Sequence, residues 1–259
     1  IANDGSGRDG DPSDPGDWVA AGECGIGAPA DTSSWHGTHV AGTIAAATNN
    51  GQGIAGIAFG AKVQALRVLG KCGGYTSDIA DAITWASGGT VGGAPANATP
   101  AKVLNLSLGG GGACDNTTQA AVNGARARGA VVVVAAGNSN ANAANFSPAS
   151  CSGVIAVAAT DRNGARAYYS NFGAVVALAA PGGDMRGNAA SGILSTLNSG
   201  TSAPSTDSYA YYQGTSMAAP HVAGVAALMF SVKPSATPDE IANALKSSAR
   251  AFPGTCSQC

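Results

Sequence analysis

Three short segments of the sequence place a residue with catalytic potential beside glycine and alanine. They are HGTHVAGT from residue 36, AAGN from residue 135 and GTSMAAPH from residue 214. Small neighbours let a substrate backbone approach closely, and a serine at a helix start lies beside free backbone N–H groups and the positive end of the helix dipole. A nucleophile, a base and oxyanion donors are the parts of an acyl-transfer site.

The elements that must position these segments alternate between helices and apolar strands. We predict helices at 38–47, 77–86, 116–128, 216–230 and 238–249, and strands at 62–69, 103–108, 131–136, 154–159 and 175–179. Continuous apolar strands between helices indicate an α/β fold with a parallel sheet covered on both faces. Ligands bind at the carboxyl ends of such strands, so residues after 69, 108 and 136 are expected there. Thr237, Pro238 and Glu240 predict a capping box at the last helix.

Composition limits the classes of function. The chain has 259 residues, 45% of them hydrophobic, and no repeat or linker divides it, so we expect one domain over 1–259. Charged residues make up 11%, the net charge is −2, and no cluster of Lys or Arg is present. We therefore expect no nucleic-acid and no membrane partner. The apolar run 130–136 is also far shorter than the roughly 18 residues of a membrane span.

The cysteines indicate an oxidising compartment. Six cysteines without paired zinc-type spacing suggest disulfides and a location outside the cytoplasm. Positions near strand ends favour the pairs Cys24–Cys72 and Cys114–Cys151. The remaining pair, Cys256 and Cys259, has a C-x-x-C spacing that could be redox-active, but the context of a thioredoxin site is missing, so a local structural disulfide is expected.

The segments HGTHVAGT, AAGN and GTSMAAPHVAG together resemble the histidine, oxyanion and serine segments of subtilisin-like serine peptidases. NLSLGG at 105–110 and AAPG at 179–182 extend the resemblance over almost the whole chain, and DPGDW followed by Cys24 is similar to a disulfide-tethered loop of secreted bacterial members. The resemblance implies a three-layer subtilisin-like fold with a mostly parallel central sheet and helices on both faces. It also implies a secreted, extracellular serine endopeptidase, monomeric, acting on proteins or peptides.

The same resemblance assigns roles to individual residues. It implies that Ser216 attacks the scissile carbonyl, that His36 takes its proton, and that Asn138 donates its amide to the oxyanion together with the Ser216 N–H. The residues that would pair with the substrate backbone as an added strand are Leu106, Ser107, Leu108 and Gly109. The residues that would line one side of the specificity pocket are Ala135, Ala136 and Gly137.

A subtilisin-like triad also needs a buried aspartate that orients the histidine. In the family it lies on an upstream apolar strand in an Asp-Thr-Gly or Asp-Ser-Gly context, which this sequence lacks. The acidic residues up to Asp31 lie in polar, Gly- and Pro-rich sequence, and none is expected to replace it. The chain begins at Ile1 without Met. We therefore expect a fragment truncated at both ends and nearly inactive, whose precursor carries a signal peptide, the acid strand and an inhibitory pro-segment that assists folding.

Calcium is the expected cofactor, in a structural role. Asp9, Asp11 and Asp14 are closely spaced in a loop turned by glycine and proline, and Ca²⁺ prefers several carboxylates with carbonyls. The alternative is a solvated acidic loop. The segment 49–54, with Asn50, resembles a second calcium loop of the family.

Other functional classes would require different features of the sequence. A non-catalytic binding protein of the same fold would have a substituted acid in the upstream sequence. A serine esterase of another fold would need a Gly-x-Ser-x-Gly elbow ahead of the acid and histidine. His36 and His39 form an i, i+3 pair without further zinc ligands. The glycines of 51–56 match a dinucleotide fingerprint, but a helix precedes them and a strand follows, which reverses the required context.

Overall fold

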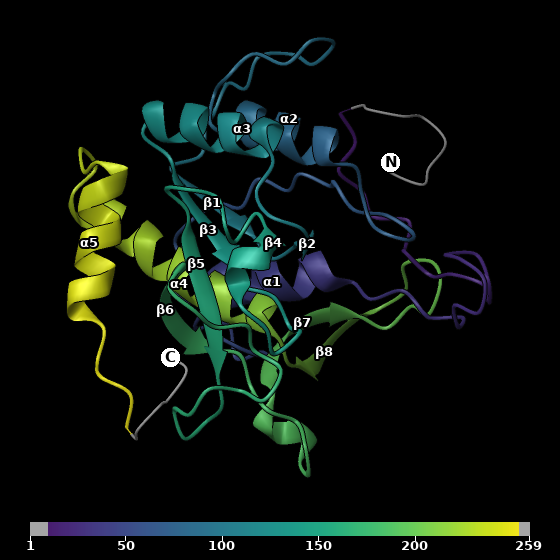
Figure 1. Cartoon of the computed structure of the whole chain (residues 1–259). Helices are drawn as coiled ribbons and strands as arrows, with labels where there is room; N and C mark the ends of the chain where they lie inside the picture. Colours follow the sequence, from purple (N-terminus) through teal and green to yellow (C-terminus); the bar gives the residue numbers. More distant parts are fainter. Residues whose placement is uncertain (1–9, 254–259) are drawn as a thin grey trace.

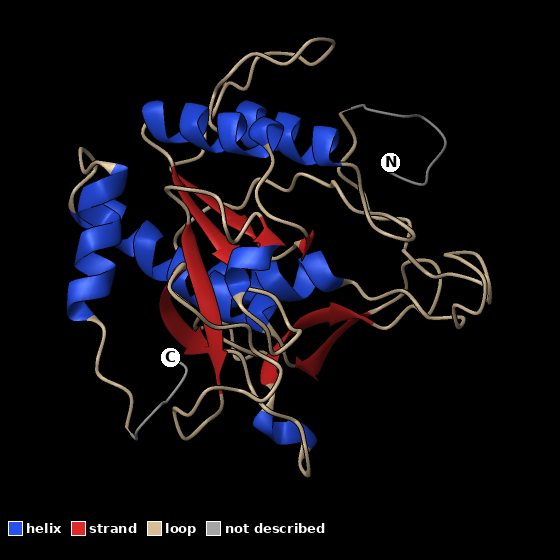
Figure 2. Ribbon diagram, in the orientation of Figure 1, coloured by secondary structure: helices blue, strands red, loops and turns tan. Residues whose placement is uncertain are grey.

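A four-stranded parallel sheet lies at the centre of the protein (Figures 1 and 2). The computed structural model describes residues 10–253. The strands stand in the order β1-β3-β5-β6, with bounds β1 (Val103–Leu106), β3 (Val131–Ala135), β5 (Ile155–Thr160) and β6 (Val176–Pro181). Every neighbouring pair is parallel, as the continuous apolar runs predicted.

Helices cover both faces of this sheet. Val132 and Val134 of β3 point into a core that includes residues of α2 (Thr76–Ala86) and α3 (Asn116–Ala127). Val131 and Val133 point the other way, into a core with α4 (Thr215–Val232) and α5 (Pro238–Ser248). All four valines are buried, which explains an unbroken apolar strand between two layers. The predicted three-layer α/β architecture is confirmed, and α1 (His36–Ala45) packs on α4.

Two small antiparallel pairs flank the main sheet, and neither was predicted. One joins β2 (Gly110–Gly111) to β4 (Phe146–Ser147), and the other joins β7 (Ile193–Asn198) to β8 (Asp207–Tyr212). Short 3₁₀ turns, η1 (Ala143–Asn145) and η2 (Ala189–Ser191), complete the elements. In β8 partly buried residues alternate with exposed ones, and the exposed positions include tyrosines. The sequence therefore lacks the alternation of apolar and polar residues that would predict a strand.

The predicted strand at 62–69 is wrong. This segment forms no ladder, because no described strand pairs with it. Leu66 nevertheless packs against the core that contains Leu104 and Leu106 of β1. β1 stands at the edge of the sheet, with a described partner only on its β3 side.

The other predicted elements are confirmed within a few residues. The capping box at Thr237 is present, with the Thr237 side chain accepting from the Glu240 N–H at 3.2 Å and Glu240 accepting from the Thr237 N–H at 2.8 Å. Both preferred disulfides, Cys24–Cys72 and Cys114–Cys151, are formed. The predicted Cys256–Cys259 pair lies outside the described residues.

One helix, α4, is long and apolar enough to span a membrane by length and composition alone, and 56% of it is buried inside the protein. It packs on β1, β3, β5 and β6 and contributes Ala218, Ala219 and Val222 to the core. These contacts are those of a core helix.

Candidate active site

His36 begins α1, and the residue before it is held in an unusual backbone conformation. Trp35 caps the helix with φ 46° and ψ 31°, in the left-handed region that non-glycine residues seldom adopt. His36 is half-buried. Burial, and next the neighbouring His39, lower the pKa of His36, whereas the negative charge of Asp17 acts to raise it. The net effect favours the neutral imidazole, which is the form a general base requires.

The hydrogen bonds of Asn138 orient its side-chain amide. Asn138 follows β3, and its Oδ1 accepts from the Thr215 N–H at 2.9 Å and from the Thr215 hydroxyl at 2.8 Å. The same hydroxyl accepts from the Gly137 N–H at 3.1 Å. Because the amide oxygen is engaged and the side chain is exposed, the amide N–H groups of Asn138 are the part left to face a ligand.

Ser216 lies in the first turn of α4, beside that amide. A Cβ placed on Gly214 would lie 3.5 Å from Asn138 Nδ2 and 3.7 Å from the Ser216 nitrogen, so both donor nitrogens lie near the same point. The Ser216 N–H makes no hydrogen bond within residues 10–253. Free N–H groups at a helix N-terminus favour negative charge. The geometry therefore brings two donors to one point beside the Ser216 hydroxyl.

Ser107 connects this point to the end of β1. The Ser107 hydroxyl donates to the Ser216 carbonyl at 2.7 Å, and the Ser216 hydroxyl donates to the Ser107 carbonyl at 3.3 Å. The latter bond is long, so the Ser216 hydroxyl is weakly held. In the described part of the chain, no hydrogen bond joins Ser216 to the His36 ring. The two residues begin helices α4 and α1, which pack on each other.

The residues predicted to bind substrate lie near this point at two strand ends. Leu106 ends β1 and is buried, Leu108 is half-buried, and Gly109 is exposed. A Cβ placed on Gly109 would lie 2.9 Å from the Ser147 carbonyl oxygen, which is too close, so the backbone favours glycine there. Ala135 and Ala136 are buried at the end of β3, and Gly137 adopts φ +103°. Positive φ favours glycine at Gly137.

Two residues that sequence reasoning missed support the site. Asn171 is fully buried and ties the chain after β3 together: its amide donates to the Ala136 carbonyl at 2.9 Å and accepts from the Ser139 and Ala141 N–H groups at 2.9 and 3.1 Å. Thr215 orients Asn138, as described above. Thr215 stands next to the candidate nucleophile, which was an available signal, whereas no motif marks Asn171.

The other two histidines have structural surroundings. His39 is fully buried, stacks on Tyr212 with ring centroids 4.5 Å apart, and places Nε2 3.0 Å from the Ala210 carbonyl. His221 lies inside α4, with Nδ1 2.8 Å from the Met217 carbonyl. Both rings thus bond to backbone carbonyls of the protein.

The residues proposed for calcium do not by themselves form a site. Within the described part of the chain, no three His, Cys, Asp or Glu side chains are grouped to hold a metal, and Asp9 lies outside that part. Asp11 accepts from the Ser13 N–H and Asp14 from the Gly16 N–H, each at 2.9 Å. Arg67 lies 3.8 Å from the Asp14 carboxylate and already supplies positive charge there.

Asn50 makes a similar local turn. Its Oδ1 accepts from the Gln52 N–H at 3.1 Å, and the side chain is exposed. One amide oxygen in a turn is a common loop arrangement and does not by itself indicate a cation.

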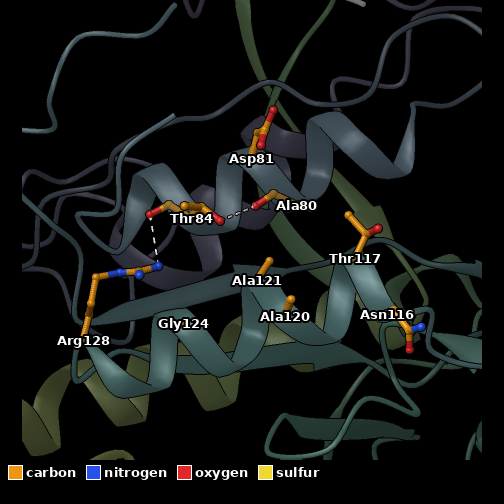
Figure 3. A pocket seen from close by; sticks show the side chains of 9 residues that line it. All are labelled: Ala80, Asp81, Thr84, Asn116, Thr117, Ala120, Ala121, Gly124 and Arg128. Atoms are coloured by element: carbon orange, nitrogen blue, oxygen red, sulfur yellow. Dashed lines mark hydrogen bonds between the residues drawn. The ribbon is translucent and has the colours of Figure 1, made fainter. Parts of the chain in front are cut away.

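A groove of about 550 Å³ between α2 and α3 lies apart from the candidate site (Figure 3). Small residues of the two helices form most of its wall, and Arg128 reaches across it to the Thr84 carbonyl at 3.4 Å. The groove belongs to the face covered by α2 and α3. His36 and Ser216 begin the helices that lie on the opposite face.

The three-layer α/β fold carries Asn138 after β3 and Ser216 in the first turn of α4, next to each other, and His36 at the start of α1. The sequence model of the subtilase family matches residues 11–258. The chain therefore belongs to the subtilase family.

Curated relatives and a solved structure agree with this assignment. The chain is similar to an "Extracellular protease" of Xanthomonas campestris, 62% identical over 99% of this chain and 43% of the relative. It is also similar to an "Extracellular basic protease" of Dichelobacter nodosus, 49% identical over 98% of this chain and 42% of the relative. A solved protease structure from Pseudoalteromonas arctica superposes with a TM-score of 0.97 and 64% identity, covering 100% of this chain and 76% of that one. The chain thus spans about two-fifths of the length of these curated relatives.

Proposed function

We propose that this chain is the catalytic domain of a secreted serine endopeptidase in which Ser216 is the nucleophile and His36 the general base. Family membership supports the class of reaction, and relatives named extracellular proteases support secretion. The observation that carries the assignment of residues is the orientation of Asn138. Its oxygen is held by Thr215, so its amide N–H groups and the Ser216 N–H flank the same point.

The proposed reaction follows from these positions. His36 takes the proton of Ser216 as its hydroxyl oxygen bonds to the scissile carbonyl carbon. The carbonyl oxygen becomes an oxyanion that accepts from Asn138 Nδ2 and from the Ser216 N–H. His36 then delivers the proton to the leaving amine, and the acyl-enzyme is hydrolysed by water activated by the same imidazole. Removing a donor of this kind from subtilisin, a member of this family, costs about 10²–10³ in kcat.

We propose that the substrate backbone lies along the end of β1. The residues Leu106, Ser107, Leu108 and Gly109 would pair with it as an added strand, a common mode of peptide recognition. Ala135, Ala136 and Gly137 would form one wall of the pocket for the side chain before the scissile bond. The Ser107–Ser216 hydrogen bonds support this placement, because they hold the proposed binding segment against the proposed nucleophile.

We propose that the aspartate of the triad comes from a strand outside this chain, inserted between β1 and the segment 62–69. β1 has no described partner on that side, and residues 62–69 pair with no strand within residues 10–253. Asn105 Oδ1 belongs to β1, and Arg67 Nε belongs to the segment 62–69. Both atoms are buried and make no hydrogen bond to described residues. Buried polar atoms are normally paired, so a further strand fits this gap.

The direct test of the acid is to compare this 259-residue chain with the product of the complete gene. Loss of the aspartate alone lowers kcat of subtilisin by about 3 × 10⁴. We expect a loss of that order for the chain alone. Equal activity of both proteins would contradict an external acid, and an upstream sequence without an Asp-Thr-Gly or Asp-Ser-Gly segment would favour a non-catalytic binding protein.

The test of the nucleophile is hydrolysis of a peptide p-nitroanilide by the complete enzyme and its Ser216→Ala variant. We expect the variant to lose activity while keeping its melting temperature. The matched control is Ser107→Ala, which we expect to weaken catalysis without abolishing it. Full activity of Ser216→Ala would overturn the assignment.

Calcium, a pro-segment and a monomeric state are further proposals that rest on the resemblance. Asp9, Asp11 and Asp14 would hold one ion, and Asn50 would contribute to a second. A melting curve with calcium and with chelator tests this, because an ion bound only to the native state stabilises it by about 2.7 kcal/mol at a hundredfold excess over its dissociation constant. An unchanged melting temperature would remove calcium from the account.

A further inference from the structure

The three residues before His36 are fixed by contacts with distant parts of the chain. Ser33 donates from its N–H at 2.8 Å and from its hydroxyl at 2.6 Å to carbonyls of the loop between β7 and β8. The Trp35 ring N–H donates to another carbonyl of that loop at 2.6 Å. Trp35 keeps its left-handed conformation under these constraints. A conformation of this kind is strained and persists only where the surroundings hold it.

The middle residue, Ser34, is held by Asp17. One Asp17 oxygen accepts from the Ser34 N–H at 2.6 Å, and the other accepts from the Ser34 hydroxyl at 2.6 Å. The Ser34 hydroxyl oxygen in turn accepts from the His36 N–H at 3.3 Å. Hydrogen bonds to a carboxylate are about twice as strong as neutral ones. Asp17 is thereby linked through one side chain to the backbone of His36.

The position of Asp17 is itself fixed by the loop that contains it. Val19 and Asp31 form an antiparallel bridge with two backbone hydrogen bonds of 3.0 Å. The Cys24–Cys72 disulfide anchors the stretch between Val19 and Asp31. The bridge brings Asp17 and Ser34 together although they are 17 residues apart. Asp17 is half-buried and bonded through both carboxylate oxygens.

We infer that Asp17 is a positioning residue for His36, acting through Ser34 on the start of α1 and through its negative charge on the imidazole. The inference rests on the proposed role of His36 as general base. Asp17 does not replace the aspartate of the triad, because in the described part of the chain no hydrogen bond joins its carboxylate to the His36 ring.

The charge of Asp17 opposes two other influences on His36. Burial and the neighbouring His39, from the same helix, lower the pKa of His36, and Asp17 is the group that raises it. Ser216 and Asn138, which lie at the start of α4 and after β3, carry no charge. Removing the Asp17 charge therefore lowers the pKa of His36 and keeps the imidazole neutral to lower pH. A purely structural contact would lack this effect.

The experiment uses the complete enzyme and the pH dependence of kcat/KM on a peptide p-nitroanilide. Asp17→Asn removes the charge but keeps an oxygen that accepts from the Ser34 N–H and gains an NH₂ group that can donate to the Ser34 hydroxyl oxygen. We expect its plateau to stay within about threefold of wild type, while the acidic limb moves to lower pH. Asp17→Ala removes the bonds as well, and we expect its plateau to fall roughly tenfold to a hundredfold, the range expected when a catalytic group is displaced.

Asp31→Asn is the matched control, because Asp31 is an exposed acid of the same loop whose hydrogen bonds, among residues 10–253, go to its neighbour Thr32 and its bridge partner Val19. It should leave both the plateau and the acidic limb unchanged. Melting temperatures show whether Asp17→Ala folds, and Asp17→Asn decides the charge effect if it does not. An unmoved acidic limb in Asp17→Asn, or an unchanged plateau in folded Asp17→Ala, overturns the inference. Full activity of His36→Ala would instead overturn the proposed function.

Discussion

Replacing Thr215 with valine removes one hydroxyl and little else, so it tests whether the orientation of Asn138 matters. Thr215 is fully buried, and valine has nearly the same shape. The change deletes the hydrogen bond to Asn138 Oδ1 at 2.8 Å and the acceptor of the Gly137 N–H at 3.1 Å. Losing such bonds in a buried place costs about 1–3 kcal/mol in the free energy of unfolding. The melting temperature should fall by a few degrees.

The expected effect on catalysis is smaller than that of deleting Asn138. The Thr215 N–H still holds Asn138 Oδ1 at 2.9 Å, so the amide is loosened and not lost. Loss of a whole oxyanion donor lowers kcat by about 10²–10³, and for Thr215→Val we expect kcat to fall by about tenfold. KM should change little, because the donors act mainly on the transition state. The assay is steady-state hydrolysis of a peptide p-nitroanilide by the complete enzyme.

Two further variants make this prediction decisive. Thr215→Ser keeps the hydroxyl and should retain kcat within about twofold. In an Asn138→Ala background, Thr215→Val should have almost no further effect on kcat, because the group it orients is already absent. An unchanged kcat in the single variant would refute the reasoning, as would an equal loss in both backgrounds.

The remaining predictions concern stability. Asn171→Ala should lower the free energy of unfolding in urea by about 3 kcal/mol, since a buried side chain loses three hydrogen bonds. Asn163→Ala, at an exposed position, should have little effect, and equal values for the two variants would contradict this. Burial lowers the pKa of His39 from 6.5, so the unfolded chain takes up a proton at a higher pH than the folded protein does. The stability that this group contributes above pH 6.5 should therefore be lost as the pH falls through the pKa of the folded state. His39→Gln should show a shallower fall in urea titrations at several pH values, and an identical slope would be evidence against it. Replacing Cys24 and Cys72 with serine removes a bond between residues 48 positions apart and should lower the free energy of unfolding by about 4 kcal/mol. Thermal melts test this, and a melting temperature equal to that of wild type would disprove it.

The features that could be predicted from the sequence are local or unusually uniform. Four consecutive valines in β3 indicate a strand buried on both faces, and the structure divides them between two cores. The capping box at Thr237 marks a helix start within four residues of sequence. Both disulfides are formed as predicted from positions near strand ends, although the strand expected at 62–69, before Cys72, is not formed.

The features that were missed depend on partners far away in the chain. Residues 62–69 have the composition of a strand, but a strand also needs a neighbour, and the described chain supplies none. Asn171 reaches residues 30–35 positions earlier, and Asp17 reaches Ser34 only because a bridge closes the loop between them. Hydrogen bonds of this kind follow from the fold and leave no periodic pattern in the sequence.

The most direct measurement of the central claim is the site of covalent labelling in the complete enzyme. A fluorophosphonate reagent reacts with an activated serine, and peptide mass spectrometry locates the adduct. Ser216 should carry one phosphonyl group, with labelling lost in Ser216→Ala and slowed strongly in His36→Ala, while Ser107 stays unmodified. An adduct on any other serine, or labelling of Ser216 at the wild-type rate without His36, would contradict the account.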